Sequence, residues 1–180
     1  MGDENSMTCV CGREGSLKLA DKTLCRSCFI GQIERRFRKT LGEKPLQKDE
    51  KVLVVGQLAA DVFKRIVTMP LHATFSDRIQ QGYGRVVIEW TMDDECVAFL
   101  EQMGGNWGFA ADTHVKLFRS CRDTEIATYA QLREIVFVPR EKNKEWNVFL
   151  AAFDDHPDMM YNLLKNVEGI KKMQISKSNI

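Results

Sequence analysis

Two close pairs of cysteines near the start of the chain constrain its fold more than any other feature. Cys9 and Cys11 form the first pair, Cys25 and Cys28 form the second, and thirteen residues separate the pairs. Two such pairs joined by a short hairpin can deliver four thiolates to one tetrahedral zinc ion. Residues 1–28 hold too few apolar side chains to form a core, so we expect a structural zinc ion to order them.

The spacing within the two pairs differs and leaves one question open. Cys25 and Cys28 have the usual two-residue spacer, whereas a single residue separates Cys9 from Cys11. The shorter spacer leaves less room for the turn that presents both sulfurs, so the sequence does not decide whether both bind the metal. A redox-active pair is the competing interpretation, but such pairs lie at the strand-to-helix junction of thioredoxin-like units, which residues 1–28 do not resemble.

The rest of the composition predicts a globular protein of a reducing compartment. The chain has 180 residues, of which 44% are hydrophobic and 28% are charged, and this is enough to bury a core. No apolar run approaches the roughly 20 residues of a membrane helix, and the polar start is unlike a secretory signal. We therefore expect a soluble, cytoplasmic protein without a membrane partner. Cys96 and Cys121 each stand alone among apolar residues and are expected in the core.

Strand and helix patterns alternate after residue 48 and predict an α/β fold with a small parallel sheet and flanking helices. Residues 69–84 show no clear pattern, and their role cannot be derived from the sequence. The expected division is a zinc knuckle (1–28), a basic helix and linker (29–48) and an α/β domain (49–180). Strands are predicted at 51–55, 85–90 and 115–118, and helices at 58–67, from Thr91 and Asp94 to Met103, near 125–135 with Asp123 as the cap, at 146–153 and at 159–167.

The segment between the cysteines and the first predicted strand is strongly basic. Residues 12–48 contain ten Lys or Arg and four Asp or Glu, a net charge of +6. Apolar residues recur every four positions from Phe29 to Leu41, which predicts an amphipathic helix that ends at Gly42 and Pro45. Such a local excess of charge suits a polyanion such as RNA, although a solvated helix face would look the same. Between the apolar positions lie Arg35, Arg36, Arg38 and Lys39.

Five segments of the chain together resemble one known family. They are Cys25-Arg-Ser-Cys-Phe29, Arg36-Phe-Arg-Lys-Thr-Leu-Gly42, Lys51-Val-Leu-Val-Val55, Arg122-Asp-Thr-Glu-Ile-Ala-Thr-Tyr129 and Phe149-Leu-Ala-Ala-Phe-Asp-Asp-His-Pro157. In this order, after a paired-cysteine knuckle, they resemble the cytoplasmic tRNA 2-thiolation proteins. The basic helix is similar to that of the second, non-catalytic subunit, and the shortened middle would make this a divergent member. The resemblance implies a degenerate pyrophosphate-loop fold of the adenine nucleotide alpha-hydrolase type.

The resemblance also implies a function. Such proteins form a heterodimer that places sulfur on the wobble uridine of cytosolic tRNAs for lysine, glutamate and glutamine. The sulfur would come from a thiocarboxylated ubiquitin-related carrier, after ATP activates the uridine. We expect the knuckle and Arg35, Arg36, Arg38 and Lys39 to contact tRNA phosphates. The α/β domain is then expected to dock on a catalytic subunit.

Two departures from the family pattern argue against catalysis by this chain itself. Where the family has a phosphate-binding turn of the Ser-Gly-Gly-x-Asp-Ser type, this chain reads Gly56-Gln-Leu-Ala-Ala-Asp61, and only Gly56 and Asp61 match approximately. The hydroxyls are missing, and Leu58 is expected to obstruct a phosphate, so we expect no ATP on this chain. The family also has a cysteine pair near its C-terminus, whereas this chain has no cysteine after Cys121. We therefore assign no catalytic residue, sulfur relay or iron–sulfur cluster.

Three other interpretations stay open at this point. The chain could be an unrelated zinc-knuckle module that binds RNA or protein, the thiolating subunit itself, or a degraded paralogue that has lost the pathway. The sequence does not reveal which tRNAs such a protein would meet, or whether it is stable without a partner.

Overall fold

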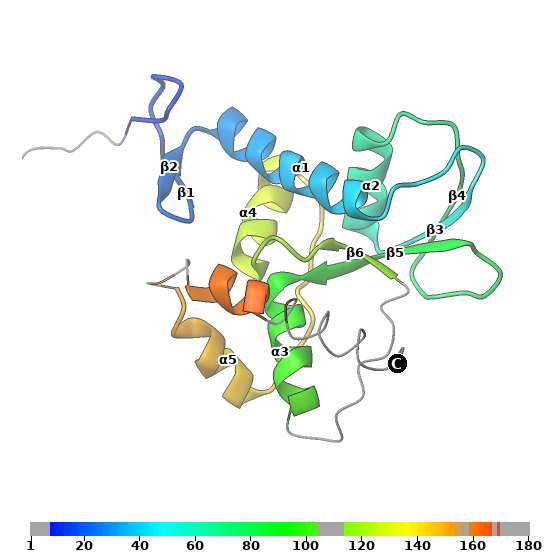
Figure 1. The fold of residues 1–180 in the computed structure, drawn as a ribbon. Helices are drawn as coiled ribbons and strands as arrows, with labels where there is room; N and C mark the ends of the chain where they lie inside the picture. Colours follow the sequence, from blue (N-terminus) through cyan, green and yellow to red (C-terminus); the bar gives the residue numbers. More distant parts are fainter. Residues whose placement is uncertain (1–7, 104–113, 155, 157–158, 167–168, 170–180) are drawn as a thin grey trace, which may run out of the picture.

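The computed structural model describes residues 8–103, 114–154, 156, 159–166 and 169, and it has the expected α/β fold (Figure 1). In this part of the chain no helix is long and apolar enough to cross a membrane. Residues 159–166 form a further helical segment. The elements are β1 (Leu17–Leu19), β2 (Lys22–Leu24), α1 (Arg26–Glu43), β3 (Lys51–Val55), α2 (Gln57–Ile66), β4 (His72–Ser76), β5 (Arg85–Thr91), α3 (Met92–Met103), β6 (His114–Phe118), α4 (Asp123–Arg133) and α5 (Lys144–Ala151).

Two sheets make up the β structure. A small antiparallel hairpin joins β1 and β2, and a four-stranded parallel sheet has the order β4-β3-β5-β6. The chain enters the larger sheet at β3, adds β4 on one side, and then returns to add β5 on the other. The strand order therefore reverses between β3 and β5, where Val55 pairs with Ile88. In open parallel sheets, ligands bind outside the carboxyl ends of the strands at such a switch point.

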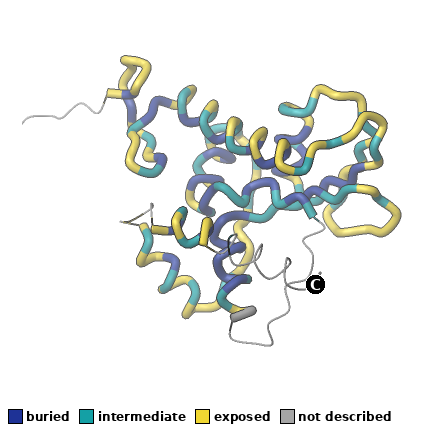
Figure 2. Tube along the Cα trace, viewed as in Figure 1, coloured by how far each residue is buried: buried dark blue, intermediate teal, exposed yellow. Residues whose placement is uncertain are grey.

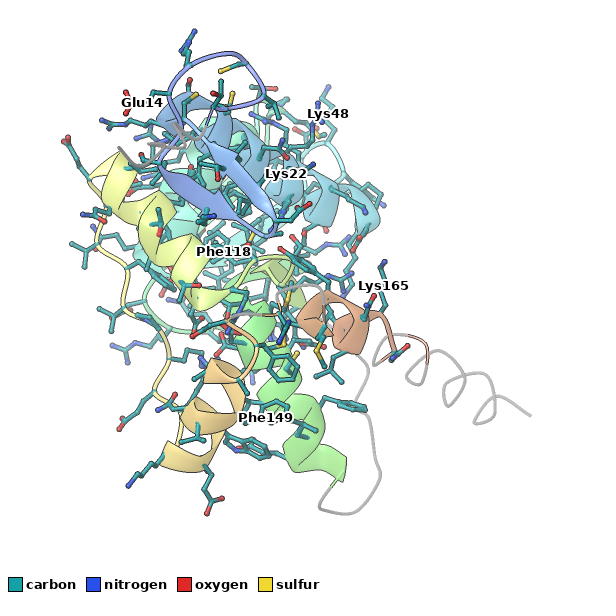
Figure 3. All side chains as sticks on the ribbon, turned by 90° about the vertical axis from the view of Figure 1, so that its left-hand side faces the viewer. Glu14, Lys22, Lys48, Phe118, Phe149 and Lys165 are labelled. Carbon is teal, nitrogen blue, oxygen red and sulfur yellow. The ribbon has the colours of Figure 1, made fainter. Side chains whose placement is uncertain are left out.

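One hydrophobic core joins the hairpin, α1, α2 and α4 to the sheet. Phe37 of α1 lies at its centre, with its ring 4.9 Å from that of Phe118 and 5.4 Å from that of Tyr129. Figure 3 shows Phe118 in the interior of the molecule. Leu24 and Cys25 belong to the same core, so the knuckle region packs against α1 through apolar contacts as well as through its cysteines. The predicted apolar stripe from Phe29 to Leu41 is buried as expected.

A second core lies where α3 meets α5 and helical residues 159–166. Met92, Cys96, Leu150, Met160 and Leu164 form it, and the Cys96 sulfur lies 3.2 Å from that of Met160. Beside it, the buried Arg122 guanidinium donates to Asp93, Asp154 and the Leu150 carbonyl. The C-terminal helices are therefore attached to α3 by apolar contacts and to Arg122, at the start of α4, by hydrogen bonds and ion pairs.

The structure corrects the sequence prediction at three elements. β4 lies within residues 69–84, for which no element was expected. Its residues are exposed or half-buried, as the colouring of that edge of the sheet in Figure 2 shows. The β1–β2 hairpin was not predicted either. Helix α4 begins at Asp123, so that Arg122 and not Asp123 is the N-cap residue. The predicted capping box of α3 is confirmed: the Thr91 amide donates to Asp94, and the Asp94 amide donates to the Thr91 hydroxyl.

Candidate functional site

The four N-terminal cysteines meet at one point beside the start of α1. Their sulfur atoms all lie within 4.8 Å of one another, and that of Cys11 is 3.5 Å from Cys9 and 3.6 Å from Cys25. Sulfurs that share one tetrahedral ion at a metal–sulfur distance of about 2.3 Å lie about 3.8 Å apart. The four cysteines are therefore placed to bind a single metal ion. Figure 3 shows sulfur atoms gathered in the loop near Glu14, beyond the hairpin that carries Lys22.

A tight turn explains how the short first pair presents both sulfurs. The Gly12 amide donates to the Cys9 carbonyl at 2.8 Å, and the Cys9 amide donates to the Arg13 carbonyl at 2.8 Å. Gly12 has a φ of +80°, a left-handed conformation that glycine adopts without steric cost. The chain thus reverses directly after Cys11, and one residue between the cysteines is enough to bring both to the candidate ion.

Helix α1 supplies the second pair. Cys25 is its N-cap residue, and Cys28 lies in its first turn, so both thiolates would lie at the positive end of the helix dipole. The Ser27 hydroxyl lies 3.4 Å from the Cys25 sulfur and is the main cause that lowers the pKa of Cys25 to about 6. The neighbouring Cys11 sulfur is the main cause that raises the pKa of Cys28 to about 12. A metal ion at this point would deprotonate all of its thiol ligands.

The predicted basic residues of α1 do not all face the same way. Arg35, Arg38 and Lys39 are exposed, and Arg38 lies 3.5 Å from Glu34. Arg36 is turned inward, where its guanidinium donates to Glu125 at 2.9 Å and to the Ser120 carbonyl at 3.1 Å. It therefore already has structural partners in this fold.

A second contact shows what Arg36 does for the fold. The guanidinium lies 5.2 Å above the centre of the Tyr161 ring and also donates to the Tyr161 hydroxyl. Tyr161 lies in helical residues 159–166, and Glu125 lies in α4. Arg36 thus connects three helices that are far apart in the sequence.

The two residues of the degenerate phosphate-binding turn lie at the start of α2. Gly56 is the N-cap residue with a φ of +106°, and Asp61 is half-buried in the second turn. The expectation that Leu58 would obstruct a phosphate is wrong, because its side chain is fully buried in the core. The space beside Gly56 is instead filled by Glu89, which the sequence analysis did not single out. The Ala59 amide donates to Glu89 Oε1 at 2.9 Å.

The two remaining cysteines have no access to solvent. Cys96 and Cys121 are fully buried, as expected, and they belong to different cores. Burial is the main cause that raises the pKa of Cys121 to about 12, so its thiol stays protonated at neutral pH. Because the thiolate is the nucleophile and the metal ligand, Cys121 is chemically inert in this fold.

The four-stranded parallel sheet and its flanking helices make this an α/β protein, and the four-cysteine knuckle that precedes the sheet is its candidate metal site. No family model matches the sequence. The chain is similar to a probable sulfurtransferase of Methanocaldococcus jannaschii, with 26% identity over 118 residues, which cover 54% of this chain and 35% of that protein. The match thus spans about a third of the length of that relative.

A solved structure shares the fold. It is the U34-tRNA thiolase NcsA from Methanococcus maripaludis with its [4Fe-4S] cluster, and the TM-score is 0.67. The superposition covers 92% of this chain and 87% of that one, at 13% sequence identity. The likeness shows a common arrangement of strands and helices.

The cysteines of this chain do not fit a cluster of that kind. Clusters of this type are held by several cysteine thiolates, each on its own iron. Outside the knuckle the chain has two cysteines, and both are buried in separate cores. Within the knuckle, sulfurs 3.5 and 3.6 Å apart are close enough to share one ion, whereas ligands of different irons lie farther apart. The donor set therefore fits a single ion.

Proposed function

We propose that this chain takes part in tRNA thiolation as a tRNA-binding and scaffold subunit. The observation that carries the proposal is the similarity to a probable sulfurtransferase, in a chain that has the fold of a U34-tRNA thiolase. The reaction would be 2-thiolation of the wobble uridine in cytosolic tRNAs for lysine, glutamate and glutamine. A catalytic partner would bind ATP and take sulfur from a thiocarboxylated ubiquitin-related carrier.

The residues available on this chain support the non-catalytic role that we propose. A cysteine relays sulfur only as an accessible thiolate, and Cys96 and Cys121 are both fully buried. The four remaining cysteines converge on one point, where they are placed to bind a metal ion. The turn after β3 lacks the hydroxyls that the family uses for phosphates. Holding a substrate and a partner is what the described residues support.

The tRNA-binding role rests on the distribution of charge. Exposed cations follow one another along the N-terminal part of the chain, from the knuckle to the segment that follows α1. Arg35 and Lys39 lie on the exposed face of α1 without an ion-pair partner among the residues that the structure describes. Contacts of this kind bind phosphates regardless of base sequence and would position the RNA for the partner. The exposed cations are Arg13, Lys18, Lys22, Arg26, Arg35, Arg38, Lys39 and Lys48.

Zinc is the ion that we propose for the knuckle. Four thiolates around one ion form the donor set of structural zinc sites, in which no position is left open for a substrate. The ion would hold residues 8–16 against the start of α1, because Cys9 and Cys11 come from the first turn and Cys25 and Cys28 from the helix. Its role is to shape the surface that carries the N-terminal cations.

Deleting the gene in its native host tests this function. We expect 2-thiouridine in bulk tRNA, quantified by mass spectrometry, to be lost and to return when the wild-type gene is restored. Pseudouridine in the same digests is the control and should not change. Unchanged 2-thiouridine in the deletion strain would contradict the proposal.

A further inference from the structure

The start of α2 is built like an anion-binding site. The helix has ten residues and begins directly after β3, at the point where the strand order of the sheet reverses. The first amides of a helix have no partner within the helix, and together with the helix dipole they favour a negative charge. A phosphate is the usual ligand of such a position in open α/β sheets.

In this chain a carboxylate of the protein already lies there. The Ala59 amide donates to Glu89 Oε1 at 2.9 Å, and the Leu58 amide also interacts with this carboxylate. Glu89 comes from β5, the strand that pairs with β3, and it follows Ile88, which lies opposite Val55. The pairing of the two strands therefore carries the Glu89 side chain to the start of α2.

The packing around Gly56 shows how closely the carboxylate fits. A Cβ atom added at Gly56 would overlap the Cγ, Cδ and Oε1 atoms of Glu89. The glycine thus leaves room for the Glu89 side chain against the backbone of the turn. In phosphate-binding turns, a glycine gives a phosphate the same close approach.

The electrostatics of Glu89 are consistent with this position. Its side chain is half-buried in a strand whose neighbours are mainly apolar. Burial raises the pKa of Glu89, and the Ala59 and Leu58 amides partly oppose this shift because they favour the charged form. A carboxylate in such a strand is costly unless backbone donors satisfy it. Helix α2 provides these donors.

We infer that Glu89 is a built-in anion that takes the place of a nucleotide phosphate at the start of α2. The ligand position at the start of α2 is closed by the chain itself. This inference goes beyond the proposed role in tRNA thiolation and does not depend on it. A chain with no connection to tRNA would have the same closed position.

Titration of the ¹⁵N-labelled protein with inorganic pyrophosphate tests the inference. In the wild type we expect no saturable change in the amide signals of Gly56, Leu58 and Ala59. In Glu89→Ala, which removes the carboxylate, the same signals should shift and saturate. Pyrophosphate should bind this variant at least about tenfold more tightly than the limit set by the wild-type titration. Glu89→Gln keeps the side-chain volume and an acceptor oxygen, so it is the matched control and should stay silent. Saturable pyrophosphate binding by the wild type would overturn the inference. So would a folded Glu89→Ala variant whose amide signals do not shift.

A second measurement needs only the wild type, in case Glu89→Ala does not fold. A scalar coupling across the hydrogen bond should connect the Ala59 nitrogen with the Glu89 carboxyl carbon in a ¹³C,¹⁵N-labelled sample. Its detection supports the built-in anion, and its absence at a sensitivity that detects backbone hydrogen bonds overturns it. Neither experiment involves 2-thiouridine, so the result stays separate from the test of the proposed function.

Discussion

The knuckle and the start of α2 are two described positions where a fold of this kind could hold a ligand, and they differ in whether the position is open. In the knuckle, four cysteines from a turn and a helix bring their sulfurs within 4.8 Å of one another. At the start of α2, Glu89 lies where a ligand phosphate would bind. One position is ready for a metal ion and the other is closed.

This difference separates a position that is open to a ligand from one that is filled by the chain itself. In the knuckle, a bound ion would order the N-terminal surface and its cations. The edge of the sheet, where α/β enzymes usually bind their substrates, has an internal contact instead. In the function that we propose, the chain holds tRNA and a partner supplies the chemistry.

Loss of the metal site should have the largest effect. In Cys25→Ser/Cys28→Ser we expect the metal content, measured by plasma mass spectrometry, to fall from one zinc ion per chain to none. A structural zinc ion contributes binding free energy on the order of 10 kcal/mol in small domains, so the amide signals of residues 8–24 should lose their dispersion. Cys96→Ala is the control and should keep its zinc. Iron in place of zinc, or zinc retained by the double variant, would contradict this prediction.

Replacing Arg36 should have the next largest effect, which is a decrease in the free energy of unfolding. Replacing it by Ala leaves the carboxylate of Glu125 without its guanidinium in a nearly buried position. Breaking such a pair from one side costs about 3 kcal/mol, which urea unfolding would detect. The exposed neighbour provides the control, since Arg35→Ala should change the free energy of unfolding by less than about 0.5 kcal/mol. Equal effects of the two variants would show that Arg36 is not buried as described.

Substitutions on the exposed face of α1 should weaken tRNA binding without changing the fold. For Arg35→Ala/Lys39→Ala we expect tRNA affinity of the assembled complex to fall, and the slope of log affinity against log salt to decrease by about 2. Arg36 has to stay unchanged in this test, because its loss would destabilise the protein. Arg78→Ala/Lys165→Ala removes the same charge from other exposed positions and should leave the slope unchanged. The same slope for wild type and the α1 variant would exclude this face as the tRNA contact.

The smallest expected effect is the contribution of Glu89 to the pH dependence of stability. Its pKa in the folded protein is raised above the usual 4.5, so the folded state holds this proton more tightly than the unfolded state. This tighter proton binding stabilises the folded state below pH 4.5, and the stabilisation is lost as the pH rises through the pKa of Glu89 in the folded state. The free energy of unfolding of the wild type, relative to that of Glu89→Gln, should therefore decrease as the pH rises. Urea titrations at several pH values measure this difference, and an increase with pH would contradict it.

The sequence predicts the interior of this fold better than its edges. Strands β3 and β5 and helix α1 are recognisable because the side chains that they bury form apolar runs or a helical stripe. Strand β4 lies at the edge of the sheet with neither face well buried, so it shows no alternation of apolar and polar residues. The strands of the hairpin have three residues each, too few for any periodic pattern.

The same limit applies to the candidate sites. The cysteine spacing predicts the knuckle because its ligands are close in the sequence. The inward turn of Arg36 depends on Glu125 and Tyr161, which lie 89 and 125 positions away, so local sequence cannot distinguish it from Arg35 or Arg38. Glu89 is recognisable only once β5 is known to lie beside β3. Its one signal in the sequence is an acidic residue within the apolar run Arg85-Val-Val-Ile-Glu-Trp90.

The central claim is that this chain holds tRNA and a partner while another subunit performs the sulfur chemistry. Complementing the deletion strain with two cysteine variants, and measuring 2-thiouridine in bulk tRNA, tests it most directly. The account predicts that Cys96→Ala/Cys121→Ala restores 2-thiouridine to the wild-type amount and that Cys25→Ser/Cys28→Ser does not. Loss of 2-thiouridine in Cys96→Ala/Cys121→Ala, expressed at wild-type abundance, would mean that this chain handles sulfur itself and would contradict the account.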